Sequence, residues 1–443
     1  MTQAVILAGG KGTRLASRLN GRPKPLVDVG GVPLLQRQLA ALAIQGVDDV
    51  VLLVNHAADQ IAEFIARLDL PIQLTLVDDG EPRGTAGATL ACIEQLQERF
   101  LVVYGDTLFD LDVGHLLAEH AQSGADATLL LHPNDHPADS DLVEVDAHGW
   151  ISGFHPYPHP AGAWLRNLVN AAFYVVERRA LLPWAGRMAV GDFAKDLFPA
   201  MLAGGARLRG HVSFEYIKDI GTPARLDKAE RQLASGLVAR ARRQTPQRAV
   251  FLDRDGTLNE LRGHIARAED LVLLSGAGHA VKRLNDAEYR VVLVTNQPVL
   301  ARGEATQSDL ARIHARLESE LGAAGAYLDD IRYCPHHPHS GYPGEVPELK
   351  RDCDCRKPAP GMVLAAAAAL NIDLAHSWMV GDSSADIALA ASLGVRSVLV
   401  ETGEGGRDGK HDAVPDHVVP SIREAAALIV AASPILSLAE PQP

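Results

Sequence analysis

Continuous runs of apolar residues, rather than alternating ones, mark the strands that we expect in this chain. Two runs lead directly into a turn that contains glycine, at residues 4–7 and 249–252. Four further runs of the same kind lie at residues 50–54, 100–104, 291–294 and 397–400. A strand that is apolar at every position is buried on both faces, as in a parallel sheet covered by helices. The pattern therefore predicts an α/β architecture.

Amphipathic stretches of helical length lie between these runs, for example at residues 34–45 and 310–321. Because strand and helix alternate in two separate blocks, we expect two α/β domains. The stretch between the blocks is polar and basic and ends in proline, which is typical of a linker. The expected first domain, linker, second domain and tail are residues 1–233, 234–247, 248–432 and 433–443.

Composition narrows the classes of function. The chain has 443 residues and a formal net charge of −13, which disfavours sequence-independent nucleic-acid binding because that needs a basic face. No apolar run is long enough to span a membrane, and the N-terminal residues lack the basic segment of a signal peptide. We therefore expect a soluble cytoplasmic protein with no membrane or nucleic-acid partner. A homo-oligomer is compatible with the sequence.

The turn after the first strand contains Gly9, Gly10 and Gly12, followed by Thr13 and Arg14. Glycine allows backbone N–H groups to approach phosphate oxygens closely. The loop fits neither the Walker A pattern nor the Rossmann dinucleotide pattern. Taken alone, it indicates a phosphate-binding loop and a tight structural turn about equally.

A stiffened lysine and two aspartates favour the phosphate interpretation. Lys24 lies between two prolines, and with Arg14 it supplies two cations that suit a triphosphate. Asp106 and Asp219 each follow an apolar segment, where carboxylates can share Mg²⁺ between phosphates. Each aspartate alone is more often a helix cap or a turn residue.

In combination, these motifs resemble those of the sugar-1-phosphate nucleotidyltransferases, and they occur in the same order. The resemblance rests on residues 7–15, 23–25, 84–88, 105–106 and 219–223. It implies a Rossmann-like, GT-A-like domain with a mixed sheet, in which a sugar 1-phosphate attacks the α-phosphorus of a nucleoside triphosphate. Arg14 would bind the leaving pyrophosphate, Lys24 would stabilise the reacting phosphates, and Asp106 and Asp219 would hold Mg²⁺.

The same resemblance implies the remaining substrate contacts of this domain. Gly9, Gly10, Gly12 and Thr13 would cradle the phosphates. Gly84 and Gly87 would let the backbone lie against the base, Asn170 would contact the sugar, and Lys195 would reach its phosphate. Nothing in residues 84–88 identifies the base by side-chain chemistry.

The sharpest motif of the second half is a pair of acids, Asp253 and Asp255, directly after a buried strand. One carboxylate can attack phosphorus while the other transfers a proton to or from the leaving oxygen. A calcium-binding loop is the alternative, but the third acid and the closing glutamate of that loop are missing.

Polar groups at the ends of later strands complete a second resemblance, over residues 249–430, to the haloacid dehalogenase superfamily of phosphatases. The groups are Thr295, Asn296, Lys357, Asp382 and Asp386. The resemblance implies a Rossmann-like domain with Asp253 as nucleophile and Asp255 as general acid and base. Thr295, Asn296 and Lys357 would bind the phosphoryl group. Asp382 would hold Mg²⁺ together with Asp253 and the carbonyl of Asp255.

Three of the four cysteines gather within a short stretch that also contains histidines. Cys334, His336, Cys353 and Cys355 have the composition of a closed tetrahedral Zn²⁺ site of structural type. His337 and His339 compete with His336 as the fourth ligand. Free thiols in a histidine-rich loop are the alternative.

This loop resembles that of the D-glycero-D-manno-heptose 1,7-bisphosphate 7-phosphatases and the related histidinol-phosphate phosphatases. The resemblance implies that Arg302 and Arg356 grip the distal phosphate of a bisphosphate. The chain departs from the family's pattern with Pro298 and Val299 after Asn-Gln, and with Ser383 after Gly-Asp.

The two resemblances predict one bifunctional enzyme with Mg²⁺ in both domains. It would remove the 7-phosphate of heptose 1,7-bisphosphate and then transfer a nucleotidyl group to heptose 1-phosphate. GTP is the expected donor, because the first half resembles the heptose 1-phosphate guanylyltransferases. The alternatives are a phosphatase for histidinol phosphate or another sugar bisphosphate, a transferase with a different base or sugar, and a first domain that only senses nucleotides.

Overall fold

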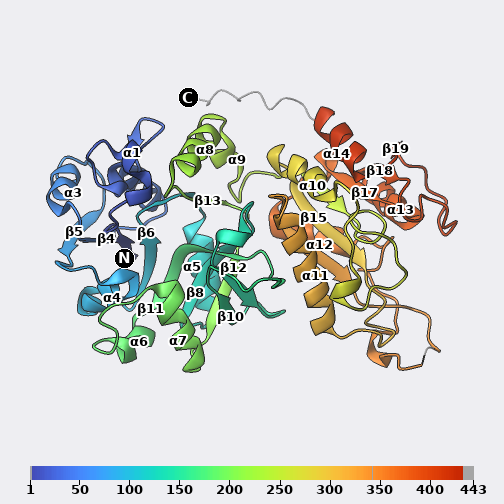
Figure 1. Cartoon of the computed structure of the whole chain (residues 1–443), viewed down its shortest axis with the longest axis horizontal. Coiled ribbons are helices and arrows are strands. Elements are labelled where there is room, and N and C mark those ends of the chain that lie inside the picture. The colour runs from blue at the N-terminus through green and yellow to red at the C-terminus, as the bar shows by residue number, and fades with distance from the viewer. Residues whose placement is uncertain (1, 342, 433–443) are drawn as a thin grey trace. The chain divides into compact units, whose positions relative to one another are not determined.

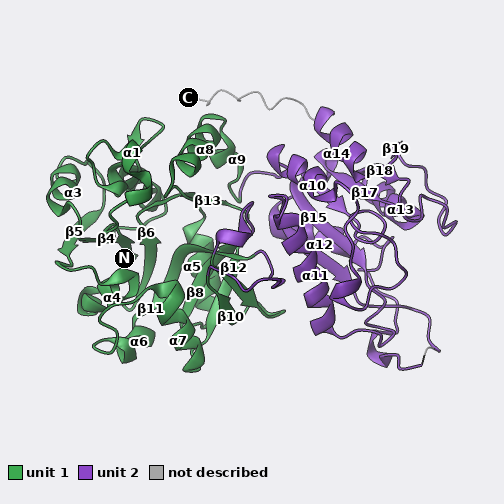
Figure 2. Ribbon diagram, viewed as in Figure 1, with its two compact units in different colours: residues 1–132, 141–156, 168–243 green, residues 133–140, 157–167, 244–443 purple. Residues whose placement is uncertain are grey.

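The computed structural model describes residues 2–341 and 343–432. The expected tail, 433–443, lies outside the described residues. The chain divides into two compact units, shown in Figure 2. Unit 1 consists of residues 1–132, 141–156 and 168–243, and unit 2 of residues 133–140, 157–167 and 244–443.

Unit 1 is built on a nine-stranded mixed sheet (Figure 1). Its main path runs in the order β10-β9-β11-β6-β1-β4-β5, and β8 connects β11 to β12. Strand β1 is parallel to β4 and β6, whereas β11 is antiparallel to β6 and β8. The strands are β1 (Gln3–Leu7), β4 (Asp49–Val54), β5 (Gln73–Asp78), β6 (Arg99–Tyr104), β8 (Ala127–His132), β9 (Leu142–Val145), β10 (Ile151–His155), β11 (Val169–Glu177) and β12 (Leu208–Val212).

The shorter elements of unit 1 connect this sheet and cover it. The ribbon pair β7 (Thr107–Asp110) and β13 (Tyr216–Asp219) is antiparallel, as is the pair β2 (Asp28–Val29) and β3 (Val32–Pro33). The α-helices are α1 (Ala16–Leu19), α2 (Leu34–Ile44), α3 (Ala58–Ile65), α4 (Gly84–Ala91), α5 (Val113–Ser123), α6 (Arg178–Leu181), α7 (Phe198–Ala203), α8 (Pro223–Ala234) and α9 (Leu237–Arg240).

Unit 2 is built on a six-stranded sheet in the order β16-β15-β14-β17-β18-β19, and every pair in it is parallel. The strands are β14 (Ala249–Leu252), β15 (Arg290–Asn296), β16 (Asp330–Cys334), β17 (Trp378–Gly381), β18 (Arg396–Val400) and β19 (His417–Val419). The α-helices are α10 (Ala277–Asp286), α11 (Gln307–Gly322), α12 (Gly361–Leu370), α13 (Ser384–Leu393) and α14 (Ile422–Ala431).

The apolar runs form strands because their side chains are enclosed on both faces. All four residues of β14 are buried, and so are Ala4, Val5 and Ile6 of β1. Each fully buried large aliphatic or aromatic side chain contributes about 1.5–3 kcal/mol by leaving water. The expectation of two α/β domains, one with a mixed sheet and one Rossmann-like, is confirmed.

Two segments of the first half of the chain, 133–140 and 157–167, group with unit 2. Within unit 2, Leu165 N donates to Ser319 Oγ of α11 at 3.0 Å. Arg166 forms an ion pair with Glu318, which is 2% exposed, and Arg316 stacks on the Trp164 ring at 4.9 Å. The sequence pattern gave no sign of this grouping.

The predicted domain limits remain predictions. The segment predicted as the linker, residues 234–247, contains the short helix α9.

No helix among the described residues is both long and apolar enough to cross a membrane.

Candidate active sites

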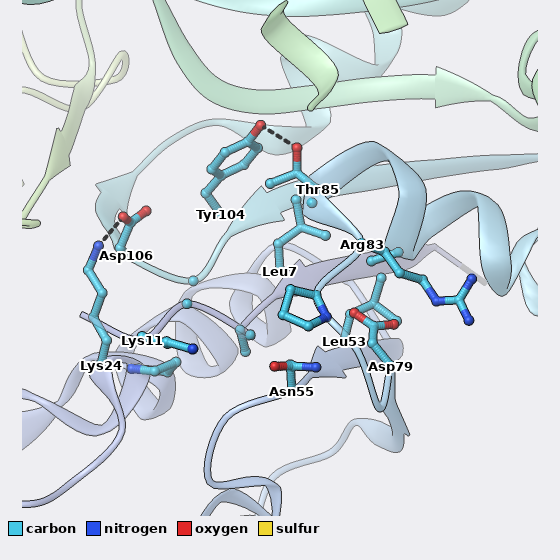
Figure 3. A pocket seen from close by; sticks show the side chains of 18 residues that line it. Leu7, Lys11, Lys24, Leu53, Asn55, Asp79, Arg83, Thr85, Tyr104 and Asp106 are labelled. Atoms are coloured by element: carbon cyan, nitrogen blue, oxygen red, sulfur yellow. Dashed lines mark hydrogen bonds and ion pairs between the residues drawn. The ribbon is translucent and has the colours of Figure 1, made fainter. Parts of the chain in front are cut away.

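The first candidate site is a cavity of about 470 Å³ in unit 1, at the carboxyl ends of β1, β4, β5 and β6 (Figure 3). The loop after β1 forms one wall through Gly9 and Gly10. A Cβ added to Gly9 would lie 3.2 Å from the Cβ of Asn55, and one added to Gly12, whose φ is +64°, would lie 3.0 Å from the Cβ of Lys24. These close approaches explain two of the three glycines, whereas a Cβ on Gly10 would meet nothing within 4 Å.

The predicted cations and acids of this site converge. Lys24 forms an ion pair with Asp106, visible in Figure 3. A Cβ on Gly221 would lie 2.8 Å from Asp219 Oδ1, 3.3 Å from Lys24 Nζ and 3.4 Å from Arg14 Nη2. Side chains from three distant parts of the sequence therefore lie close together around Gly221 and Asp106: Arg14, Lys24, Asp106 and Asp219. The Lys24 side chain is 11% exposed, whereas Arg14, like Thr13 beside it, is exposed.

A hydrogen-bonded group beside the cavity was not anticipated from the sequence. Tyr104 Oη donates to Thr85 Oγ1 at 3.1 Å, and Thr85 Oγ1 donates to Asp192 Oδ2 at 2.7 Å. Burial raises the pKa of Tyr104 well above its ordinary value, so its hydroxyl keeps its proton. Tyrosine and threonine in apolar surroundings carry no distinctive sequence signal, which is why only the fold identifies them.

The other predicted contacts of unit 1 are less closely assembled. Gly84 lines the cavity, but its missing side chain is also required by packing, because a Cβ there would lie 2.4 Å from Gly191 O. Gly87 packs in the same way against Ala189 O, at 2.6 Å. Asn170 accepts a hydrogen bond from the amide of Ala172, and Lys195 is exposed. Gly87, Asn170 and Lys195 are not among the residues that line this cavity.

The second candidate site is a cavity of about 600 Å³ in unit 2, where β14, β15 and β17 end. Lys357 Nζ lies 2.7 Å from Asp253 Oδ1 and 2.6 Å from Asp386 Oδ1, and it donates to Val294 O at 2.9 Å. Although burial disfavours its charge, the two carboxylates raise the pKa of Lys357 above its usual range. These contacts favour the charged form of the Lys357 ammonium and hold it in one place.

Three carboxylates surround this single ammonium. Oxygens of Asp253, Asp382 and Asp386 lie within 4.8 Å of one another, and all three residues are buried. Burial raises the pKa of Asp253 to about 6 even though Lys357 opposes the shift. Burial, and next the charge of Asp253, raises the pKa of Asp382 to about 8. The excess of negative charge fits a divalent cation with oxygen ligands.

Asp386 is the third carboxylate of this cluster. Asp386 Oδ2 accepts hydrogen bonds from Ser383 N and Oγ, so that it caps α13 while its other oxygen holds Lys357. The sequence suggested Asp386 as a nearby acid, and the structure gives it the position of a residue that orients the lysine.

The carboxylate of Asp255 is directed to other partners. Arg254 Nη2 donates to it at 2.9 Å, and Asn259 and Gln297 donate at 3.0 Å. Burial acts to raise the pKa of Asp255, but Arg254 and these hydrogen bonds hold it below the ordinary value. These contacts favour the ionised form of the Asp255 carboxyl group. Arg254 is completely buried, and the sequence alone gave it no role.

Some of the remaining residues predicted for the phosphatase line the cavity, one of them positions Lys357, and one does not line the cavity. Thr295 and Arg356 line the cavity, and Arg356 Nη1 also donates to His336 O at 3.1 Å. Asn296 lines it too, but its amide bonds to Lys357 N and Lys357 O at 3.0 and 3.2 Å, which positions that lysine. Arg302 is not among the lining residues.

Two glycines, Gly256 and Gly403, pack closely against the Asp382 carboxylate. A Cβ on Gly256 or on Gly403 would lie 2.1 or 2.0 Å from Asp382 Oδ2. That oxygen accepts a hydrogen bond from Glu404 N at 2.7 Å, and Thr402 Oγ1 donates to Gly256 O at 2.7 Å. No side chain fits at either glycine, so Asp382 keeps its orientation.

Cys334, His336, Cys353 and Cys355 gather beside this cavity. The three Sγ–Sγ distances are 3.2, 3.3 and 3.5 Å, too long for a disulfide, and His336 Nδ1 lies 3.3 Å from Cys355 Sγ. Burial lowers the pKa of His336, which favours the neutral imidazole that a metal needs. His337 Nδ1 instead accepts a hydrogen bond from His339 N at 3.2 Å, so His336 is the histidine of this set.

Comparisons with known proteins agree with the two units. A nucleotidyl transferase family model matches residues 3–236, and a HAD-hydrolase-like model matches residues 354–425. The D-glycero-β-D-manno-heptose-1,7-bisphosphate 7-phosphatase of Yersinia pestis is 42% identical over 158 residues, which are 35% of this chain and 81% of that protein.

Two solved structures are similar to parts of the chain. The crystal structure of HddC from Yersinia pseudotuberculosis is 26% identical and covers 53% of this chain and 100% of its own, with a TM-score of 0.46. The D,D-heptose 1,7-bisphosphate phosphatase from B. bronchiseptica, complexed with magnesium and phosphate, is 33% identical. It covers 42% of this chain and 100% of its own, with a TM-score of 0.38.

Proposed function

Since the chain belongs to the nucleotidyl transferase family and to the D-glycero-β-D-manno-heptose-1,7-bisphosphate 7-phosphatases, we propose that it carries out two consecutive steps of heptose activation. Unit 2 removes the 7-phosphate of heptose 1,7-bisphosphate. Unit 1 then transfers a nucleotidyl group, with GTP as the expected donor, to heptose 1-phosphate and releases pyrophosphate. The product of the first step is the acceptor of the second.

The observation that carries the phosphatase assignment is the buried contact of Asp253 with Lys357, at 2.7 Å. A carboxylate fixed beside a permanent cation is an oriented nucleophile, because the cation also attracts the incoming phosphoryl group. Asp253 attacks phosphorus and forms an aspartyl phosphate as the sugar oxygen leaves. Asp255 delivers a proton to that oxygen and then takes one from the water that hydrolyses the intermediate.

The ion pair of Asp255 with Arg254, at 2.9 Å, favours the ionised carboxylate. The dianionic phosphate of the substrate would raise the proton affinity of Asp255 through like-charge repulsion. Protonation on substrate binding then provides the acid for the first half-reaction, and the resulting carboxylate is the base for the second.

Nucleotidyl transfer uses the converging side chains of unit 1. Lys24 and Arg14 offset the charge of the triphosphate and of the leaving pyrophosphate, while the loop after β1 supplies backbone N–H groups. The acceptor's phosphate oxygen attacks the α-phosphorus in line with the departing pyrophosphate. The network of Tyr104, Thr85 and Asp192 supports the cavity on the side of α4.

The possible metal ligands of the chain fit two kinds of metal ion. Asp253 and Asp382 in unit 2, with the Asp255 carbonyl, and Asp106 and Asp219 in unit 1 would hold Mg²⁺, which offsets phosphate charge when bound. Three thiolates and one imidazole suit structural Zn²⁺, which would fix the loop that carries Arg356 and Lys357. Metal analysis of the purified protein should give about one zinc per chain. The double variant Cys353→Ser, Cys355→Ser should lose it.

One reaction tests both activities. Heptose 1,7-bisphosphate, Mg²⁺ and equal amounts of GTP, ATP, CTP and UTP are incubated with the protein, and the products are identified by mass spectrometry. Phosphate together with one nucleoside diphosphate heptose supports the bifunctional assignment. Phosphate without any nucleoside diphosphate heptose supports the phosphatase activity of unit 2. It contradicts heptose 1-phosphate as the acceptor in unit 1. A parallel reaction contains histidinol phosphate in place of the heptose bisphosphate. Phosphate release in that reaction alone favours the alternative phosphatase.

A further inference from the structure

Two polar side chains stand in the nucleotide cavity without an assigned role. Asn55 directly follows β4 and Asp79 directly follows β5, and the Asp79 amide donates to Val54 O at 2.9 Å. Both residues line the cavity. In Figure 3 they lie on the side of the cavity away from Lys24 and Asp106.

Their position along the sheet fits the far end of a nucleotide. Asp106 follows β6, and the order β6-β1-β4-β5 places the phosphate loop between Asp106 and the ends of β4 and β5. Three strand spacings separate β6 from β5, or about 14 Å. A nucleoside triphosphate whose phosphates lie at Lys24 and the loop therefore directs its base toward Asn55 and Asp79.

Both side chains have unused hydrogen-bonding capacity. Asn55 Nδ2 is buried and has no hydrogen-bond partner in the described parts of the chain. Burial raises the pKa of Asp79, and the charge of Arg83 only partly offsets this. Buried polar groups in native proteins are nearly always hydrogen-bonded, so the unpaired Asn55 Nδ2 in a cavity indicates a ligand with a complementary acceptor. The half-buried Asp79 carboxylate lines the same cavity and can accept hydrogen bonds from that ligand.

We propose that Asp79 and Asn55 select guanine as the base of the nucleotide donor, an inference that rests on the nucleotidyl transfer proposed above. The two carboxylate oxygens of Asp79 accept from N1–H and the 2-amino group of guanine, and Asn55 Nδ2 donates to O6. The three groups on that edge of guanine are thus all paired.

The other bases fit this pair of side chains less well. Adenine offers one amino group but places the N1 acceptor beside it, toward the carboxylate. Uracil has a single N–H between two carbonyl oxygens, both of which a carboxylate repels. Cytosine can pair its amino group with Asp79 and N3 with Asn55, but it leaves one carboxylate oxygen without a donor. A site with unpaired polar groups rejects such ligands.

The test compares kcat/KM for GTP, ITP and XTP with heptose 1-phosphate as acceptor. Inosine lacks the 2-amino group, so the unaltered protein should favour GTP over ITP by about tenfold or more. Asp79→Asn should lower kcat/KM for GTP by roughly 10- to 100-fold. The same variant should gain activity with XTP, because the amide N–H₂ can donate to the 2-oxo group of xanthine. Asn55→Ala should lower kcat/KM for GTP about tenfold.

Asp78→Asn is the matched control, because Asp78 is adjacent in sequence, exposed, and not among the lining residues. It should leave the GTP to XTP ratio unchanged. An Asp79→Asn variant that keeps the ratio of the unaltered protein, or that loses all nucleotides equally, overturns the proposal. An active unaltered protein that prefers another base overturns it as well. Absence of any nucleotide product from the unaltered protein counts against the proposed function itself.

Discussion

The two lysines proposed to act on phosphate groups, Lys357 in unit 2 and Lys24 in unit 1, have very different environments. Lys357 in unit 2 is 3% exposed and contacts Asp253, Asp386 and a backbone carbonyl, whereas Lys24 in unit 1 is 11% exposed and is paired with Asp106. The cation beside Lys24, Arg14, is exposed. The lysine of the unit 2 site is therefore more deeply buried and has more charged partners than the lysine of the unit 1 site.

The difference follows from what each site has to bind. A phosphatase of this kind carries its own nucleophile, which must be fixed against the phosphoryl group. A nucleotidyltransferase brings two substrates together, so its cavity must admit both. We expect substitutions in unit 2 to affect stability as well as activity, and substitutions in unit 1 to affect activity with little change in stability.

The largest expected effect is that of Asp253→Asn. An amide is not a nucleophile, so phosphate release should fall by at least about 10⁴-fold, as expected for loss of a covalent catalyst. Transfer to heptose 1-phosphate supplied directly should stay within about twofold of the unaltered protein. Phosphate release and pyrophosphate release are measured separately on the same preparation. Loss of both activities together would contradict two independent sites.

Lys24→Met tests whether nucleotidyl transfer can be lost while the phosphatase activity is kept. Removal of a cation from the reacting phosphates should lower pyrophosphate release by about 10²–10³-fold. Phosphate release from heptose 1,7-bisphosphate should not change, because unit 2 contains its own lysine. A parallel fall in both rates would indicate that one site serves both reactions.

The stability difference is tested with Lys357→Met beside Lys24→Met. Removing Lys357 leaves buried carboxylates without their cation, which should cost about 3–5 kcal/mol of unfolding free energy. Lys24 has a single partially exposed partner, so its loss should cost about 1 kcal/mol or less. Urea unfolding followed by fluorescence gives both values. Equal losses would show that the two lysines are equivalent in the folded protein.

The smallest expected effect is a pH-dependent stabilisation by Mg²⁺. Burial raises the pKa of Asp253 to about 6 and that of Asp382 to about 8, above the value of about 3.9 in an unfolded chain. Their contribution to stability is complete below pH 4 and is lost as pH rises through these folded pKa values. Magnesium, which binds the ionised carboxylates, should therefore raise Tm by more at pH 8 than at pH 5.5.

Thermal unfolding with EDTA and with Mg²⁺ at both pH values measures this shift. Asp382→Asn serves as the control, because it removes the group with the higher pKa and should reduce the Mg²⁺ effect at pH 8. A magnesium-induced shift in Tm that is the same at the two pH values would contradict the charge distribution of the cluster.

Much of the fold was predictable because it depends on local pattern. The fully apolar runs that became β1, β4, β6, β14, β15 and β18 fell where the strands are, and the stretch 34–45 became α2 (Leu34–Ile44). A short motif after an apolar run also indicated Asp253, which directly follows β14 at the edge where the carboxyl ends of parallel strands meet. Cys353, Cys355 and Lys357 lie in the segment between β16 and α12, and this rule does not position them.

What the sequence determined by itself was therefore the type of each element and the kind of chemistry at each strand end. The tertiary structure alone decided which groups meet: Asp386 with Lys357, Arg254 with Asp255, and Asn55 and Asp79 in one cavity. It also grouped residues 133–140 and 157–167 with unit 2. Periodicity indicates whether a side chain is buried, whereas the partner of each charged or polar side chain depends on packing and charge in the folded chain.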